Sequence, residues 1–262
     1  AEERRPEVYF MVYDESGAPI RRVSGGIEAG FQRAAWDLRY PAVSPHEPTE
    51  DGEDFPPAAA QGTLALPGSY SVRAFQKVGD AVTELGAAQN FKVAADGQGS
   101  MNAADRAALE EFQRKVARLY RAVSGAMHTA DDVEVRLKSI REALRETPAA
   151  EKQLDAAADS IEQNDRLILR ALSGDKDLKK RNEPVPSSIN DRIEAIMEGE
   201  RFSLAKPIQS HIDDYKIAAA EFAEQLGKLR TLVEVDLAKL EKDMEAAGAP
   251  WTPGRVPEWS EK

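Results

Sequence analysis

The chain has no cysteine, only three histidines and no long uncharged apolar segment. Without cysteine there are no disulfides, no thiolate metal sites and no cysteine nucleophile. No apolar run approaches the ~20 residues that a membrane-spanning helix needs. Acidic side chains outnumber basic ones by 46 to 35, and the net charge of −11 argues against nucleic-acid binding, because phosphate neutralisation requires a clustered basic surface. We therefore expect no nucleic-acid partner and no direct membrane span.

Few residues are available for catalysis or metal binding. The three histidines, His46, His128 and His211, have no HxxxH or ExxH spacing around them, which argues against a metal site. The sequence also lacks GxSxG, a P-loop and a complete GxGxxG. We therefore predict a protein that is not an enzyme and holds no cofactor or metal. A catalytic alternative stays open, because triads depend on geometry, and it requires a polar pocket around one of these histidines.

The composition changes near residue 100. Before it, glycine and proline are frequent and apolar residues alternate; after it, Ala, Leu, Glu, Lys and Arg recur with helical spacing. This change predicts an α+β protein of two domains. Residues 1–96 are expected to form an immunoglobulin-like β-sandwich, 97–101 a linker, 102–248 an elongated antiparallel helical bundle, and 249–262 a Trp/Pro-rich tail.

The first part shows six short segments typical of strands. Within 29–39, period-two spacing places Trp36 in the core, and Asp37 and Arg39 on the opposite face. That pair is either an exposed ion pair or part of a docking face. Gly79-Asp80 predicts a tight hairpin. The expected strands are 7–13, 19–24, 29–39, 69–78, 81–85 and 89–94.

A long insert, 41–66, separates two of these strands. It holds five prolines, five acidic residues and the aromatic Phe55. Such a composition buries little apolar surface on its own. The insert is therefore either a solvated loop or an arm that is ordered by contact with a partner.

The helical part carries a heptad pattern. Apolar residues recur at alternating steps of three and four over five heptads, which predicts one helix over 103–146, capped by Asn102. The seam residues are Leu109, Phe112, Val116, Leu119, Val123, Ala126, Ala130, Val133, Leu137, Ile140 and Leu144.

Three further helices are expected, at 148–173, 188–198 and 205–247. Thr147-Pro148 is expected to start the first of them, and Pro207 to lie in the first turn of the last. The intervening 175–186 reads as a polar loop. In the last helix the apolar seam shifts position after Val233.

The C-terminal tail combines two tryptophans with several prolines. Proline excludes a helix here, and exposed tryptophan is typical of interaction hot spots. The tail therefore either packs back onto the bundle or docks on a partner. The predicted partner-binding residues are Trp251, Pro253, Pro257 and Trp259 of the tail and Phe55 of the insert.

Three stretches carry a family resemblance. AGFQRAAWDLRYP (29–41), LPGSYSVRAF (66–75) and QNFKV (89–93) resemble the C-terminal region of bacterial sortilin-like proteins with BNR/Asp-box β-propellers. This chain contains no SxDxGxxW Asp-box, so the resemblance does not extend to the propeller or its activity. It implies an exported protein, in the periplasm or on the outer face of a bacterial membrane, and a non-catalytic appended module.

Together these observations predict a structural and interaction module that braces a larger envelope assembly, for example as an accessory subunit of a membrane-protein complex. The oligomeric state stays open. The alternative is a carbohydrate- or peptide-binding accessory domain of an exported propeller-type, hydrolase-like protein. In that alternative the stacking faces come from Tyr9, Tyr13, Phe31 and Tyr40.

Overall fold

A computed structural model describes residues 5–42, 62–95, 101–148, 152–200, 203, 205–257 and 259. It is an α+β structure with a four-stranded antiparallel sheet and several helices. The chain divides into two compact units, Ala1–Ala117 with Met197–Ile208, and Arg118–Ile196 with Gln209–Lys262. Phe55 and the predicted linker, apart from Met101, lie outside the described residues.

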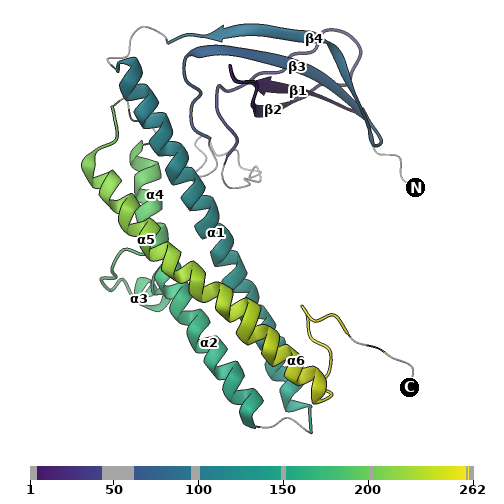
Figure 1. Cartoon of the computed structure of the whole chain (residues 1–262), viewed down its shortest axis with the longest axis vertical. Coiled ribbons are helices and arrows are strands. Elements are labelled where there is room, and N and C mark those ends of the chain that lie inside the picture. Colours follow the sequence, from purple (N-terminus) through teal and green to yellow (C-terminus); the bar gives the residue numbers. More distant parts are fainter. Residues whose placement is uncertain are drawn as a thin grey trace. The chain divides into compact units, whose positions relative to one another are not determined.

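The sheet has the order β2-β1-β3-β4, and every neighbouring pair is antiparallel (Figure 1). The predicted hairpin at Gly79-Asp80 joins the last two strands, and Gly79 has a φ of +60°. A positive φ at the first turn position is what a type II′ turn requires. The strands are β1 (Glu7–Tyr13), β2 (Pro19–Gly25), β3 (Gly68–Val78) and β4 (Ala81–Val93).

One face of the sheet holds a small apolar core. Its buried residues are Val12, Ile20 and Tyr70, and Trp36 packs against them half buried. The Trp36 ring lies 5.5 Å from that of Tyr70 and 6.1 Å from that of Phe91, both edge-to-face, an arrangement that aromatic pairs prefer. The predicted core role of Trp36 is confirmed.

The strand predicted at 29–39 is wrong. Leu38 has a φ of 58°, in the left-handed region, which is incompatible with a strand and uncommon for leucine. Asp37 accepts a hydrogen bond from the backbone NH of Arg39, which favours a turn over a ladder. Only an isolated bridge, Arg39 to Leu64, forms there. The described residues contain one sheet, so the second layer of a sandwich stays a prediction.

The last strand is one element, where the sequence suggested two. The pairing of β3 with β4 steps between Val72 and Ala74, which leaves Gly86, Ala87 and Ala88 opposite Arg73. Gly86 has a φ of +78°. This bulge divides β4 at the position where the sequence pattern breaks.

Helix α1 (Ala103–Arg145) begins as predicted. Asn102 accepts a hydrogen bond from the NH of Asp105 at 2.8 Å and donates one to its carboxylate at 2.9 Å. Leu119 is half buried, and every other residue of the predicted seam is buried. The heptad pattern therefore identifies the packed face of this helix.

The remaining helices correct three expectations. A short helix occupies part of the predicted 175–186 loop, because Asp175 caps it by accepting from the NH groups of Asp177 and Leu178. Thr147 does not start a helix; its hydroxyl donates backwards to the carbonyl of Ala143 in α1. Pro207 precedes the last helices and is not part of them.

The helices that follow α1 are α2 (Lys152–Ser173), α3 (Lys176–Lys180), α4 (Ile189–Glu200), α5 (Gln209–Thr231), η2 (Leu232–Leu237) and α6 (Ala238–Ala246).

In the second unit, α2 packs against the continuous α5-η2-α6 segment (Figure 1). Ion pairs connect α1 to both. Arg141 lies 2.8 Å from Asp159 of α2, and Arg136 pairs with Glu241 of α6. Within the described ranges, no helix combines the length and hydropathy that crossing a bilayer requires.

The π-helix η2 explains the shifted seam of the last helix. Leu232 and Leu237 are both buried although they are five positions apart. In an α-helix this spacing would place them on different faces, whereas the i→i+5 bonding of a π-helix aligns them. Beyond it the buried seam continues through Leu240 and Met244.

Candidate protein-interaction site

The C-terminal segment after α6 contains four of the five predicted partner-binding residues. It is described through Pro257, and again at Trp259. α6 ends at Ala246, and Gly248, two residues later, has a φ of +70°. The NH of Gly248 donates to the carbonyl of Glu245, and that of Ala249 to Met244, both at 3.0 Å. This pair of bonds is the Schellman motif, which terminates helices with a left-handed glycine.

A tight turn then reverses the chain. The NH of Arg255 donates to the carbonyl of Thr252 at 3.3 Å, across Pro253 and Gly254. Gly254 has a φ of +95°. Proline followed by a glycine with positive φ is the signature of a type II turn. The tail therefore has a defined conformation that its own sequence encodes.

Arg255 ties this turn back to the end of α6. Its guanidinium donates to the carbonyls of Ala249, at 3.3 Å, and Pro250, and lies 3.4 Å from the carboxylate of Glu245. Only 4% of the side chain is exposed. Opening the turn would break these contacts, and hydrogen bonds made by a charged group contribute more to stability than neutral ones. The sequence analysis did not identify Arg255 as a residue of this site, although it is the only charged residue in 249–257.

The same turn presents apolar side chains to solvent. Trp251 is 61% exposed, Val256 89% and Trp259 84%. The indole NH of Trp251 donates to the carbonyl of Arg255 at 2.9 Å, so its polar edge is satisfied internally. Pro253 and Pro257 are exposed as well. The sequence left open whether the tail packs back onto the helices or docks on a partner. In the structure Thr252 and Arg255 are buried, so the backbone of the turn packs back, whereas the aromatic side chains stay exposed.

The residues proposed for sugar stacking are not brought together. Tyr9 and Tyr13 share the sheet face opposite the core, where Arg22 lies 4.0 Å from the Tyr9 ring centroid and Arg73 5.2 Å from that of Tyr13. Tyr40 packs on the other, core-bearing face. Phe31 is fully exposed in the segment after β2. This arrangement leaves no shared stacking platform among the four.

The histidines do not form a site in the described structure. His128 is exposed on α1, His211 is half buried on α5, and His46 lies outside the described residues. Among the residues that the structure describes, no cluster of three metal-ligating side chains occurs.

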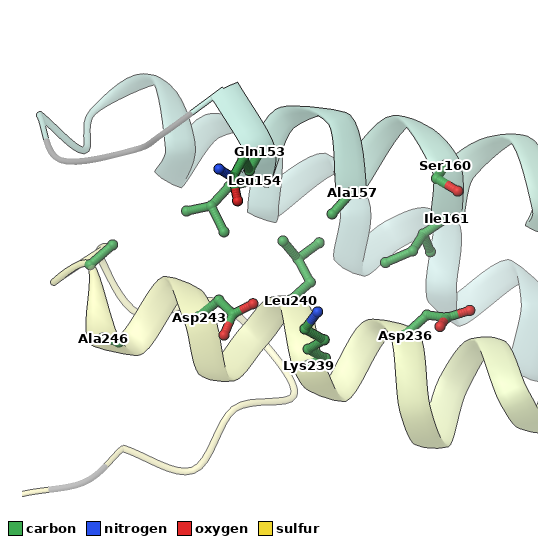
Figure 2. Close-up of a pocket in the computed structure, with 11 residues that line it drawn as sticks. Gln153, Leu154, Ala157, Ser160, Ile161, Asp236, Lys239, Leu240, Asp243 and Ala246 are labelled. Atoms are coloured by element: carbon green, nitrogen blue, oxygen red, sulfur yellow. The ribbon is translucent and has the colours of Figure 1, made fainter.

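A groove of about 670 Å³ runs between α2 and the η2-α6 segment (Figure 2). Leu154, Ile161 and Leu240 line its apolar part, and Asp236, Lys239 and Asp243 are among its polar residues. None of the residues that line this groove is a histidine. It therefore does not provide the histidine pocket that the catalytic alternative requires.

One buried acid interrupts the helical core. Asp165 of α2 is 3% exposed, and its Oδ1 has no hydrogen-bond partner among the described atoms. Burial, followed by the charges of Glu134 and Asp131, raises the pKa of Asp165 to about 7. The sequence carried a signal for it: the α2 seam steps from Ile161 to Ile168, and Asp165 occupies the vacant heptad position.

No known protein family matches the chain, and no curated protein or solved structure matches it either. The resemblance to sortilin-like proteins stays a prediction based on the three quoted stretches.

Proposed function

We propose that this protein is a non-catalytic structural and interaction module that binds a protein partner through its C-terminal turn. The observation that carries the proposal is the exposure of Trp251 and Val256 on a segment whose backbone is tied down, with the exposed Trp259 close by in the sequence. Large aromatic side chains dominate the energetics of protein interfaces. Their exposure in water is unfavourable unless a partner covers them.

The turn favours binding because it is preorganised. The Schellman motif at Gly248, the turn at Gly254 and the fold-back of Arg255 hold the backbone before any partner arrives. The hydrogen bond from Trp251 restricts its ring in the same way. A partner therefore orders few additional torsions, which lowers the entropic cost of association.

The partner's chemistry follows from the side chains that the turn presents. Trp251, Val256, Pro257 and Trp259 offer apolar and aromatic surface, and Arg255, the one charged residue among 249–257, is buried. We expect a protein surface with apolar pockets that accept indole rings and proline, surrounded by polar groups.

The remaining features of the proposal concern architecture and location. We propose that the sheet is one layer of an immunoglobulin-like sandwich, and that the helices form an antiparallel bundle that braces the assembly. The long buried seam of α1 supports the second part. As the family resemblance implies, we place the protein in the bacterial envelope, with membrane proteins among its candidate partners.

The proposal is tested in the native assembly. A photo-crosslinking amino acid at position 256 should form an adduct with another protein, because this side chain is the most exposed of the three. The matched control carries the same crosslinker at Leu167 of α2, which is also exposed, at 57%. We expect the adduct from position 256 only.

Substitution then measures the contribution of the indoles. The double variant Trp251→Ala/Trp259→Ala should abolish co-purification with the crosslinked partner, and Leu167→Ala should leave it unchanged. Each truncated hot-spot tryptophan costs about 2 kcal/mol or more, which lowers the affinity by more than tenfold. Unchanged co-purification of the double variant would refute the proposed role of the turn.

A further inference from the structure

Strand β4 is an unusually open edge of the sheet. It pairs only with β3 among the described strands and runs for 13 residues. Residues 81–90 are all exposed, including Val82 at 52% and Leu85 at 42%. An edge of this length, with unpaired backbone groups and apolar side chains, is a template for another strand.

Natural edges are protected by proline, by several charges or by a covering element. β4 has no proline and two charged residues, Glu84 and Lys92. In the described part of the chain, the bulge at Gly86–Ala88 and these two charges are the features that protect it, and bulges do limit edge pairing. However, the three bulged residues are small and uncharged, and the straight arms on either side of them stay open.

We propose that β4 pairs antiparallel with β4 of a second copy of this chain, about a two-fold axis at Ala88. In a continuous antiparallel sheet, paired residues must lie on the same face. Among the registers that satisfy this condition, only the one centred on Ala88 places Glu84 of each copy opposite Lys92 of the other. Opposite charges across an antiparallel pair are stabilising.

The apolar side chains agree with the same register. Leu85 pairs with Ala74, and Phe91 with Tyr70, so both side chains belong to the core-bearing face of the sheet. Centring on Ala88 sets Leu85 opposite Phe91 of the second copy. Glu84 and Lys92, opposite Phe75 and Ser69 in β3, share the other face. One register thus satisfies the charged and the apolar pair simultaneously.

The bulge is compatible with this symmetry. Because the axis passes through Ala88, the last residue of each bulge faces its copy at the centre. The arm 81–85 of one copy then faces residues 91–95 of the other. The neutral residues Gly86 and Ala87 lie opposite Asn90 and Gln89, where no charge is buried.

The charge pair provides the first test, by sedimentation velocity of the full chain over a concentration series. We expect a dimer for the unaltered protein. Glu84→Lys and Lys92→Glu should each weaken dimerisation by about tenfold or more, because two-fold symmetry replaces two attractive pairs with two repulsive ones. The double variant Glu84→Lys/Lys92→Glu should restore it. Circular dichroism checks that each variant is folded.

The absence of cysteine provides the second test. Ala88→Cys introduces the only thiol of the chain, and the symmetry axis brings two copies of it together. Mild oxidation should therefore give a covalent dimer. Val82→Cys is the matched control: six residues from the axis at about 3.4 Å each, the two thiols would be about 40 Å apart.

The proposal is overturned if the unaltered chain stays monomeric up to about 1 mM, the weak limit of specific association. It is also overturned by a dimer that resists both charge reversals, or by equal crosslinking at positions 88 and 82. If the monomeric chain instead binds an extended segment of another protein through β4, the occupant is that protein and the self-pairing is wrong. None of these results bears on the proposed partner binding by the C-terminal turn, because the turn lies in the other unit.

Discussion

The guanidinium of Arg136 lies against the α-carbon of Gly254. A β-carbon at position 254 would stand 2.6 Å from Nε of Arg136 and 2.8 Å from its Cζ, closer than real β-carbon contacts. Arg136 also pairs with Glu241 of α6, and its side chain is only 25% exposed. The C-terminal turn is thus fitted against an arginine that is already held in place.

We predict that Gly254→Ala opens this turn. Alanine would meet Arg136 and would also have to adopt a φ of +95°, which costs an L-residue about 1–2 kcal/mol. Hydrogen exchange at the Arg255 amide, which is bonded to Thr252, should accelerate by about tenfold or more. Gly248→Ala is the control that isolates backbone strain. Gly248 also has a positive φ, +70°, but a β-carbon at position 248 would meet no atom within 4 Å. Unchanged exchange in Gly254→Ala would contradict the assigned contact.

We predict that Asp165 makes the protein less stable as the pH rises. Its folded pKa of about 7 lies above the unfolded value of 3.8, so the folded state holds the proton more tightly between these values. The free energy of unfolding of the unaltered protein, relative to Asp165→Asn, should therefore fall by up to about 4 kcal/mol from about pH 4 to about pH 7 and then level off.

Urea denaturation at several pH values measures this difference. The charges nearest to the carboxyl, Glu134 and Asp131, are acidic, and they pair with Lys138 at 2.9 Å and Lys176 at 4.0 Å. Asp213→Asn serves as the control. The pKa of Asp213 is lowered by hydrogen bonds from Gln209 and Lys216, so its replacement should not reproduce the trend. Parallel pH profiles for the unaltered protein and Asp165→Asn would exclude the assignment.

We predict that Ser188→Ala destabilises the start of α4 by about 1 kcal/mol, the usual contribution of a helix cap. The NH of Asp191 donates to the Ser188 hydroxyl at 3.2 Å, and the NH of Ser188 donates to the Asp191 carboxylate at 2.9 Å. Ser187→Ala, one residue earlier and exposed, should change the free energy of unfolding little. Equal effects of the two substitutions would argue against the cap.

The carboxylate of this cap adds a pH dependence of the opposite sign to that of Asp165. Burial opposes its charge, but hydrogen bonds from Lys179 and Ser188 outweigh burial and lower the pKa of Asp191. Its stabilising contribution is therefore present above the unfolded pKa of 3.8 and lost as the pH falls through the lower folded value. Asp191→Asn should remove this acid-side dependence in the same denaturation series.

We predict that Gly125→Ala stabilises α1. This glycine lies inside the helix, and a β-carbon there would meet no atom within 4 Å. Alanine is favoured over glycine in a helix interior by roughly 0.5–1 kcal/mol. Thermal unfolding should show a higher Tm for the variant. A lower Tm would mean that the outer surface of α1 at this position is occupied by something other than solvent.

The seams and caps were predictable because they depend on residues a few positions apart. The heptad seam of α1, the Asn102 cap and the Ser188–Asp191 box all follow from such local spacing. The strand prediction at 29–39 also failed for a local reason. Leu38 lies in the left-handed region of backbone conformation, and it interrupts an alternation of apolar residues that otherwise looks regular.

The sequence by itself determined which faces of the helices are buried, where several helices begin and end, and that the tail is not helical, because periodicity, capping and proline act through neighbouring residues. Tertiary structure decided the rest. It placed Gly254 against Arg136 and buried Asp165 beside the acids of α1. These relationships join residues far apart in the chain, and their geometry exists only after the helices and strands have packed.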